Sequence, residues 1–434
     1  LAQRLKATAN GSTIKAVLNS KFASDNFNGQ VVGFEMNSSK NAAGVDETAI
    51  NLVNSKIIAD RTDAGAGAIG AFINYGLVNI DATSTIEVEK ESNVVNKQAV
   101  GVYAVNGSKV DNKGTIDVGG DQSVGILGMA YRVDNSNKAI VNEFGGKLGE
   151  GTVNITNEKD IKMSGKDAIG IYAKNNHSNA ATRNLSTIHN EAPISLGDNS
   201  KAIVIQTTNT EGATLTLKDS GTNQDIKVGK KGIGVYAEYS DIKLASDYGI
   251  AIKDDGVAIQ TKGTSNVDGA GKTLNVELGK NSTFGLLNGN KSTTASPLLS
   301  KYLNNGTTDK INITSFGEGA SIFYATLKAK AILDADYTVT NGGADSTSVL
   351  VANDGANVEI ASGKTLTTNT NVGLVATKGA GASLSTSVAE NKGTLISTRT
   401  DKGIGIYTYT ANGENSGTII MKNQNSVGIL GSGG

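Results

Sequence analysis

The phrase "NKGTIDVGGDQSVGILG" occupies residues 112–128, and "NSGTIIMKNQNSVGILG" occupies residues 415–431. Ten of the seventeen positions are identical without a gap. Neither copy contains histidine or cysteine, so the phrase lacks the side chains that most often carry chemistry. Internal self-similarity of this kind is the signature of stacked structural repeats.

The end of the phrase recurs along the whole chain as an apolar residue, a small residue and a second apolar residue. Clear copies are "AVGVYA" (99–104), "AIGIYA" (168–173), "GIGVYA" (232–237) and "GIGIYT" (403–408). When degenerate copies are included, fourteen can be aligned, about 30 residues apart on average. Their central positions are 33, 70, 101, 125, 170, 204, 234, 258, 285, 322, 350, 373, 405 and 428.

The columns of this alignment have the pattern of a β-strand. The residue after the centre is apolar in all fourteen copies, and the residue before it is apolar in all but one, where Ser321 stands. Apolar residues at every second position predict a strand with one buried face. The variable column two residues after the centre, which includes four tyrosines, is then expected on the other face.

A second short strand precedes most copies, as at 116–118, 194–196 and 419–421, and "N-x-G-T" often introduces it. Short units that cannot bury a face alone must stack on one another. Each unit therefore reads as a turn, a strand, a turn and a strand. The predicted fold is all-β: a right-handed parallel β-helix of about fourteen coils, forming one continuous segment over residues 1–434.

The remaining residues are expected to form loops or small helical insertions. "SPLLSKYLNN" (296–305) has Ser296 as a helix N-cap and Pro297 at the first helical position, which is a helix start signal. Residues 1–22 have a weak helical pattern. The segments expected to lie outside the coils are 130–150, 174–190, 206–222, 238–255 and 290–308.

Composition excludes several classes of protein. The 40 basic and 41 acidic residues form no basic run, so nucleic acid is not an expected partner. Zero Cys excludes disulfides and thiolate metal sites, and no apolar stretch reaches the roughly 18 residues of a membrane helix. The chain starts at Leu1 and carries no signal peptide, so both ends are expected to continue in a longer protein.

No motif predicts catalytic residues, a metal site or a cofactor. The "GIG" copies lack the third glycine and the βαβ context of a nucleotide loop. His177 and His189 are the only histidines, and no acid or nucleophile stands at a recognisable spacing from them. The carboxylates at 87, 89, 91, 254 and 255 are interpreted as solvated surface groups. We therefore expect a protein that is not an enzyme, with a β-helical polysaccharide lyase or hydrolase and a purely structural spacer as the alternatives.

Ligand contact is expected from inserted loops, because the coils are constrained by their core and their backbone ladder. A sugar site needs an aromatic platform with a few polar groups beside it. The segment 238–255 offers Tyr239, Asp241, Asp247 and Tyr248, which are the candidate ligand-binding residues.

The "GIGIYA"-like copies interleaved with "NKGTI" and "NSGTI" resemble the passenger domains of large fusobacterial type V autotransporter adhesins, and the likeness covers nearly the whole chain. A galactose-inhibitable member, also called an apoptosis protein, is favoured over an arginine-inhibitable one. The resemblance implies a bacterial cell-surface or secreted passenger, anchored by an outer-membrane barrel elsewhere in its protein. The implied partners are galactose-type host glycans, other bacteria, or a lymphocyte inhibitory receptor. No binding residue is carried over from the family.

Overall fold

The computed structural model describes most of the chain as strands and tight turns, and it contains no helix among the residues that it describes. The chain divides into two compact units, residues 1–228 and residues 229–434. The described ranges are 6–18, 31–37, 49–61, 67–90, 98–105, 107–130, 153–175, 186–207, 213–220, 225–263, 265–269, 271–289, 301–303, 310–334, 336–339, 348–379 and 386–433.

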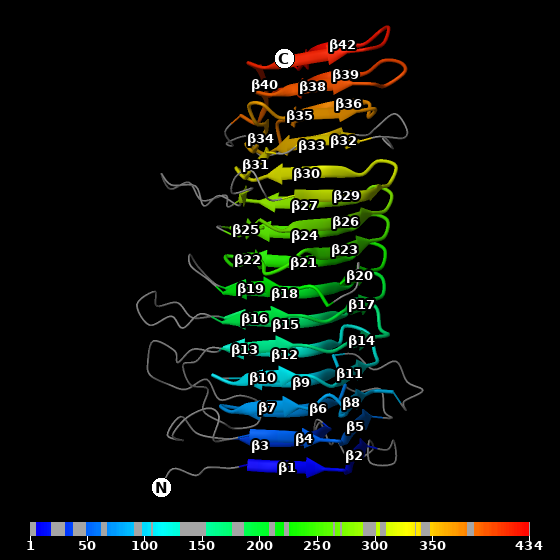
Figure 1. Cartoon of the computed structure of the whole chain (residues 1–434), viewed down its shortest axis with the longest axis vertical. Coiled ribbons are helices and arrows are strands. Elements are labelled where there is room, and N and C mark those ends of the chain that lie inside the picture. Colours follow the sequence, from blue (N-terminus) through cyan, green and yellow to red (C-terminus); the bar gives the residue numbers. More distant parts are fainter. Residues whose placement is uncertain are drawn as a thin grey trace. The chain divides into compact units, whose positions relative to one another are not determined.

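In the first unit, the strands form three parallel sheets, and each strand pairs with the strand three places further along the chain (Figure 1). Sheet A1 contains β1 (Lys6–Asn10), β4 (Ala49–Val53), β7 (Leu77–Ile80), β10 (Lys109–Asn112), β13 (Asn154–Asn157), β16 (Thr187–Asn190) and β19 (Thr214–Leu217). Sheet B1 contains β2 (Thr13–Leu18), β5 (Lys56–Arg61), β8 (Thr85–Val88), β11 (Thr115–Val118), β14 (Ile161–Met163), β17 (Ile194–Leu196) and β20 (Ile226–Val228). Sheet C1 contains β3 (Val32–Asn37), β6 (Ile69–Asn74), β9 (Val100–Val105), β12 (Val124–Ala130), β15 (Ile169–Asn175) and β18 (Lys201–Thr207).

The second unit repeats the arrangement, with a fourth sheet in its later coils. Sheet A2 contains β22 (Asp241–Leu244), β25 (Asn266–Asp268), β28 (Lys301–Leu303), β31 (Lys330–Leu333), β34 (Asn357–Ile360), β37 (Val388–Asn391) and β40 (Asn412–Asn415). Sheet B2 contains β23 (Tyr248–Ile252), β26 (Thr273–Leu278) and β29 (Lys310–Phe316). Sheet C2 contains β21 (Ile233–Glu238), β24 (Val257–Lys262), β27 (Thr283–Asn288), β30 (Ser321–Thr326), β33 (Ser348–Asn353), β36 (Val372–Thr377), β39 (Ile404–Tyr409) and β42 (Val427–Ser432). Sheet D2 contains β32 (Tyr337–Val339), β35 (Thr365–Thr368), β38 (Thr394–Ser397) and β41 (Thr418–Met421).

The predicted all-β parallel β-helix is confirmed, and the 42 strands of the described residues follow as fourteen successive triplets along the chain. The prediction of two strands per coil is wrong, because each coil has three. The missed strands form sheets A1 and A2. Several of them, including β16, β19 and β22, fall inside the segments that the sequence assigned to insertions. The parts of those insertions at 131–150, 176–185, 208–212, 221–222, 290–300 and 304–308 lie outside the described residues.

Both helical predictions fail where the structure describes them. Residues 6–10 and 13–18, expected to be weakly helical, are the strands β1 and β2. Residues 301–303, within the predicted helix 296–305, are the strand β28, while Ser296 and Pro297 lie outside the described residues. Parallel pairing to an adjacent coil gives these segments hydrogen bonds that outweigh a weak local helix preference.

The repeated small residue marks a place where two consecutive side-chain positions face the core. In β15, Gly170 and Ile171 are both buried, while Ile169 and Tyr172 are half-buried on the outer face. A Cβ on Gly170 would lie 2.6 Å from the Ala202 carbonyl oxygen, so glycine permits the close approach of the neighbouring coil. The expected strict alternation is therefore wrong at this point, and the residue before the centre lies outside the core.

The strand register also moves three of the fourteen proposed centres. Ile169 pairs with Lys201 and Ile171 pairs with Ile203, so the central residue of β18 is Ala202 and not position 204. By the same comparison, the centres of β27 and β33 are Phe284 and Val349. The core volume of a coil is thus shared between two adjacent inward positions, and either one can hold the large side chain.

The corners before β12 and β18 combine a left-handed residue with a serine. Gln122 and Asn199 have φ angles of 57° each, a conformation that such polar residues tolerate in turns. The next residues are Ser123 and Ser200. Their Oγ atoms accept hydrogen bonds from backbone N–H groups of the preceding coil, at 3.2 Å from Ala99 and 3.1 Å from Ala168. These serines satisfy amides that the corner would otherwise leave unpaired.

A ladder of buried asparagines continues the stacking inside the first unit. Asn112, Asn157 and Asn190 occupy the same inward column of sheet A1 and are fully buried. The amide nitrogen of Asn112 donates to Asn157 Oδ1 at 2.7 Å, and the amide nitrogen of Asn157 donates to Asn190 Oδ1 at 2.8 Å. In neighbouring coils the same column holds Ile80 and Leu217, so this position accepts either apolar packing or a fully connected polar ladder.

We expect Asn157→Leu to destabilise the first unit although leucine occurs naturally in this column. The change strands the buried Asn112 donor and the buried Asn190 acceptor, at a cost of about 1–3 kcal/mol for each group. Urea denaturation followed by circular dichroism measures the loss. The triple variant N112I/N157L/N190L restores a uniform apolar column and should recover part of it. A triple variant less stable than Asn157→Leu would contradict this account.

Candidate functional site

The four ligand-binding candidates from the sequence do not lie on one inserted loop. Tyr239 occupies a left-handed corner position (φ 48°), and Asp241 begins β22. Asp247 is exposed and accepts a hydrogen bond from the Thr273 backbone N–H at 2.7 Å. Tyr248 begins β23 and is 1% exposed, so it belongs to the core. The segment 238–255 is part of a coil, and Tyr248 cannot serve as a surface platform for a sugar.

A column of tyrosines and aliphatic residues instead lies on the outer face of sheet C2. Its members share one position in each strand, two residues after the central one, and are in register between coils. They are Tyr236, Gln260, Leu286, Tyr324, Val351, Val375, Tyr407 and Leu430. The side chains are half-buried apart from Leu430, which is exposed. The sequence predicted an outward column here, and the structure confirms that it faces away from the core.

Polar groups lie beside the tyrosines of this column. The Tyr324 hydroxyl accepts a hydrogen bond from Asn353 Nδ2 at 3.3 Å, and Asn353 Oδ1 accepts one from Thr377 Oγ1 at 3.1 Å. The Tyr407 hydroxyl lies 3.1 Å from Ser432 Oγ, and Tyr409, next to it on β39, is 51% exposed. An apolar ring edge with amide and hydroxyl groups beside it has the composition of a surface that binds carbohydrate. We call Tyr324, Asn353, Thr377, Tyr407 and Tyr409 the tyrosine face.

Sheet C1 has a related but more enclosed outer column. Phe72 and Tyr103 contact each other edge to face, with ring centroids 5.4 Å apart. The Tyr103 hydroxyl reaches the Met129 sulfur at 3.7 Å, and the Tyr172 hydroxyl donates to Gln206 Oε1 at 2.9 Å. Phe72 is fully buried although its column faces outward, so this part of the column is a secondary apolar cluster. The tyrosine face on sheet C2 is the more accessible of the two.

The stacked acids of sheet A2 are held as ion pairs. Glu359 and Glu390 are in register on adjacent strands, which places two carboxylates side by side. Lys392 lies 3.2 Å from Glu359 Oε2 and 3.0 Å from Glu390 Oε2, and Lys330 lies 3.1 Å from Glu359. The hydrogen bond to Glu390, followed by that to Glu359, raises the pKa of Lys392. Both glutamates are therefore held in ion pairs with lysines.

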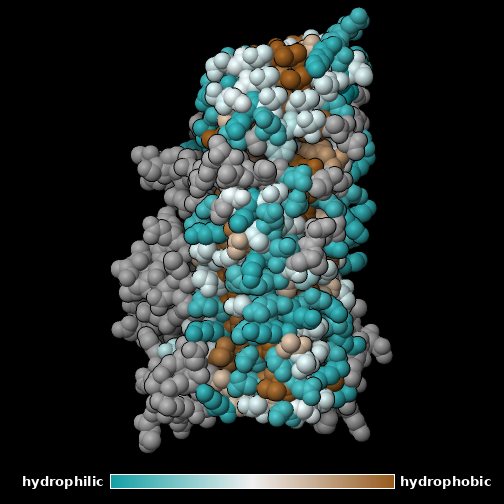
Figure 2. Space-filling model, viewed as in Figure 1, coloured by the Kyte–Doolittle hydropathy of each residue, from teal (hydrophilic) through white to brown (hydrophobic). Residues whose placement is uncertain are grey.

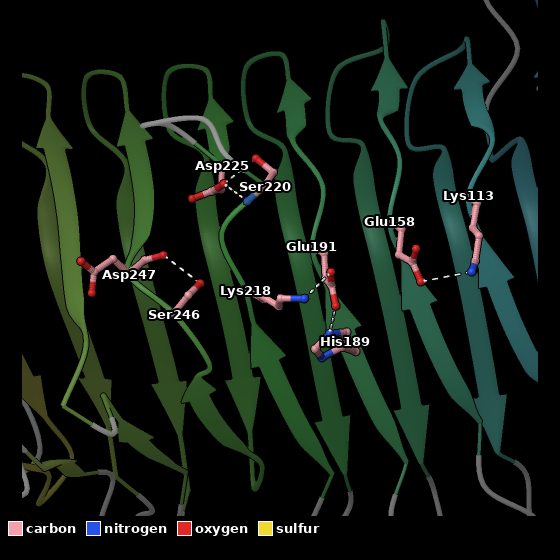
Figure 3. Close-up of polar contacts among 9 residues, drawn as sticks. All are labelled: Lys113, Glu158, His189, Glu191, Lys218, Ser220, Asp225, Ser246 and Asp247. Atoms are coloured by element: carbon pink, nitrogen blue, oxygen red, sulfur yellow. Dashed lines mark hydrogen bonds and ion pairs between the residues drawn. The ribbon is translucent and has the colours of Figure 1, made fainter. Parts of the chain in front are cut away.

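His189 takes part in a similar ladder at a corner of sheet A1. Figure 3 shows Glu191 between His189 and Lys218, with Glu158 and Lys113 paired at the corresponding corner of earlier coils. Lys218 Nζ is 2.8 Å from Glu191 Oε2, and this hydrogen bond, together with that from His189, lowers the pKa of Glu191. Within the described residues, His189 forms a hydrogen bond with Glu191 and none with a hydroxyl group. His177 lies outside the described residues.

The other carboxylates singled out in the sequence have local partners. Glu87 pairs with Lys56 at 2.8 Å. Glu89 is buried, so its interpretation as a solvated surface group is wrong, and its Oε1 accepts a hydrogen bond from the Ala68 backbone N–H at 2.8 Å. Asp254 accepts from the Lys280 backbone N–H, which is the main cause of its lowered pKa. Asp255 accepts from Asn281. Glu91 lies outside the described residues.

One groove crosses the outer face of sheet B1. It has a volume of about 450 Å³ and crosses β11, β14 and β17. Its polar lining residues are Lys90, Asp117, Asp160, Lys162, Ser164 and Ser195. No motif predicted this cluster, because its members come from coils that stacking alone brings together.

The described residues contain no group of three or more histidine or acidic side chains placed to hold a metal ion. The described residues include no helix that is long and apolar enough to cross a membrane. The molecular surface presented in Figure 2 is mostly hydrophilic, with small hydrophobic patches. No protein-family model, curated protein or solved structure matches this chain.

Proposed function

We propose that this chain is a β-helical segment of a bacterial surface adhesin that binds glycans on host cells or other bacteria. The observation that carries the proposal is the tyrosine face of sheet C2. Its outward tyrosines have no part in the core, and amide and hydroxyl groups lie beside them. The resemblance of the repeated phrases to autotransporter adhesin passengers supports the same function and a location at the cell surface.

The stacking of the coils supports a scaffold role. Inward columns are filled by apolar residues or by the asparagine ladder, and the backbone amides pair with adjacent coils. Such a framework holds outward side chains in fixed positions, so little conformational entropy is lost when a ligand orders them. We favour a binding function over an enzymatic one because Glu359 and Glu390, the acids in register on adjacent strands, are both engaged in ion pairs with Lys392.

The proposal is tested with the whole chain on a glycan array that includes galactose-terminated structures, followed by attachment to cells. Tyr324→Ala and Tyr407→Ala together should reduce binding by about thirtyfold, since each aromatic contact contributes of order 1 kcal/mol. Tyr239→Ala in the same unit is the matched control and should bind normally. Loss of binding only in Tyr239→Ala would place the ligand at that corner instead.

The rival functions give different results in the same experiments. Time-dependent release of sugar fragments from pectin-type or host polysaccharides would favour a β-helical lyase or hydrolase. Failure of the intact chain to bind any glycan or cell would favour a structural spacer. Retained thermal stability in the tyrosine variants is the required control, because both side chains are half-buried.

A further inference from the structure

The groove on sheet B1 arises from the register of three neighbouring coils. Asp117, Lys162 and Ser195 occupy one outward column of β11, β14 and β17, and Lys227 follows in β20. The short side chain of Ser195 stands between two long lysines, which opens the sheet face at that coil. Asp160 and Pro193 lie just before β14 and β17, and Ser164 just after β14; all three line the same groove.

The charged groups in the groove fall into two sets. Lys90 Nζ is paired with Asp117 Oδ1 at 2.8 Å, so each neutralises the other. The side chains of Asp160 and Lys162 form no hydrogen bond or ion pair within the described part of the chain, and both line the groove. The groove therefore offers one ammonium group, one carboxylate and the hydroxyls of Ser164 and Ser195 to a ligand.

This set of groups matches a sugar acid. A ligand carboxylate fits the ammonium of Lys162, and ligand hydroxyls can donate to Asp160 and exchange hydrogen bonds with the two serines. A nucleic acid would find no aromatic side chain in the lining on which a base could stack. A single free amino acid could pair with Asp160 and Lys162 but would leave much of the groove filled with water. We propose that this groove binds a uronic-acid unit within an oligosaccharide.

The proposal deepens the glycan-binding function proposed above and rests on it, but it uses a different surface. Binding of tri-galacturonate to the whole chain is measured by isothermal titration calorimetry. Lys162→Met should weaken binding by about tenfold to a hundredfold, because a charge-assisted hydrogen bond is lost. Asp160→Asn should weaken it less, since the amide oxygen still accepts a hydrogen bond from a sugar hydroxyl. Lys227→Met, exposed in the same column but outside the groove lining, is the matched control and should bind normally.

Three further titrants separate the ligand chemistries: a neutral galactose trisaccharide, free glutamate and a sulfated heparin trisaccharide. Binding of tri-galacturonate with at least tenfold preference over all three supports the proposal. Equal binding of the neutral sugar, binding of glutamate alone, or equal losses in Lys162→Met and Lys227→Met would overturn it. No binding of tri-galacturonate would also overturn it.

The proposals for the tyrosine face and for the groove can fail independently. If Lys162→Met no longer binds tri-galacturonate but still attaches to cells and binds the glycan array, both proposals are supported, and the two ligands bind to separate surfaces. If the tyrosine-face variants bind cells normally while tri-galacturonate still binds, the proposed tyrosine site fails and the groove remains. Thermal unfolding of each variant confirms that Lys162→Met and Asp160→Asn keep the fold, as expected for outward side chains.

Discussion

Replacing Ile171 with Asp is expected to unfold the first unit under conditions in which the unchanged chain is stable. Ile171 is fully buried in β15, between Ile126 of the preceding coil and Ile203 of the next. Loss of the isoleucine side chain costs about 2–5 kcal/mol, and enclosing an unpaired carboxylate adds several more. Because each coil supports its neighbours, the loss extends to the adjacent coils.

The measurement is the urea midpoint of the whole chain, followed by circular dichroism and by limited proteolysis. Lys174→Asp is the matched control: it puts the same charge on the same strand, at a half-buried outward position. This control should unfold close to the unchanged chain. Equal midpoints for the two variants would show that β15 does not present Ile171 to a core.

Gly165→Ala is also expected to destabilise the first unit. Gly165 lies at the corner between β14 and β15, and a Cβ there would lie 1.7 Å from the carbonyl oxygen of Gly120. The other close atoms also belong to backbone, at 2.4 Å and 2.9 Å, so no side-chain rotation relieves the overlap. The two coils must move apart, and overpacking of this kind costs about 1–3 kcal/mol or more.

Gly197→Ala is the control for this change, because Gly197 follows β17 at a corner of the next coil. A Cβ there would meet only the Gly165 carbonyl oxygen, at an ordinary 3.4 Å. It should change the unfolding midpoint little, and it can stabilise slightly by restricting the unfolded chain. Similar losses in both variants would indicate that corner glycines are needed for backbone conformation and not for close approach of the coils.

In this β-helix, outward and inward side chains occupy separate columns, so the proposed binding surfaces can be altered without altering the core. The tyrosine face and the groove both use outward positions, whose partners are hydroxyls, amides and charges. Changes there should leave the unfolding midpoint nearly constant while altering ligand affinity. The core changes above should do the opposite, and this contrast allows the two proposals to be tested without ambiguity from misfolding.

The sequence by itself determined the class of fold and the number of coils. Repeated apolar columns, seen around Val102, Ile126 and Ile406, carry that information locally, because every coil must present the same face to its neighbours. It also predicted the outward column that contains Tyr172, Tyr236 and Tyr407. Such a pattern can be found without knowing which residues meet in space.

The tertiary structure alone decided the third strand of each coil and the finer register. Strands such as β13 (NITN) and β16 (TIHN) carry only one apolar residue, and a buried asparagine reads in sequence as a turn. In β27 the large inward residue is Phe284, and the space beside Gly285 is filled by the ring of Phe323 from the next coil, whose Cδ1 would lie 2.7 Å from a Cβ at 285. Glycine therefore does not mark the centre there.

The same limit explains the candidate sites. Tyr248 reads as a surface tyrosine among charged neighbours, yet it pairs in register with Leu274 and is buried in the core. The groove joins Lys90, Asp117, Lys162 and Ser195 from coils up to about a hundred residues apart in the chain. Loop lengths between strands vary, so sequence spacing does not reveal which side chains share a column. Only the hydrogen-bonded register between coils brings these groups onto one surface.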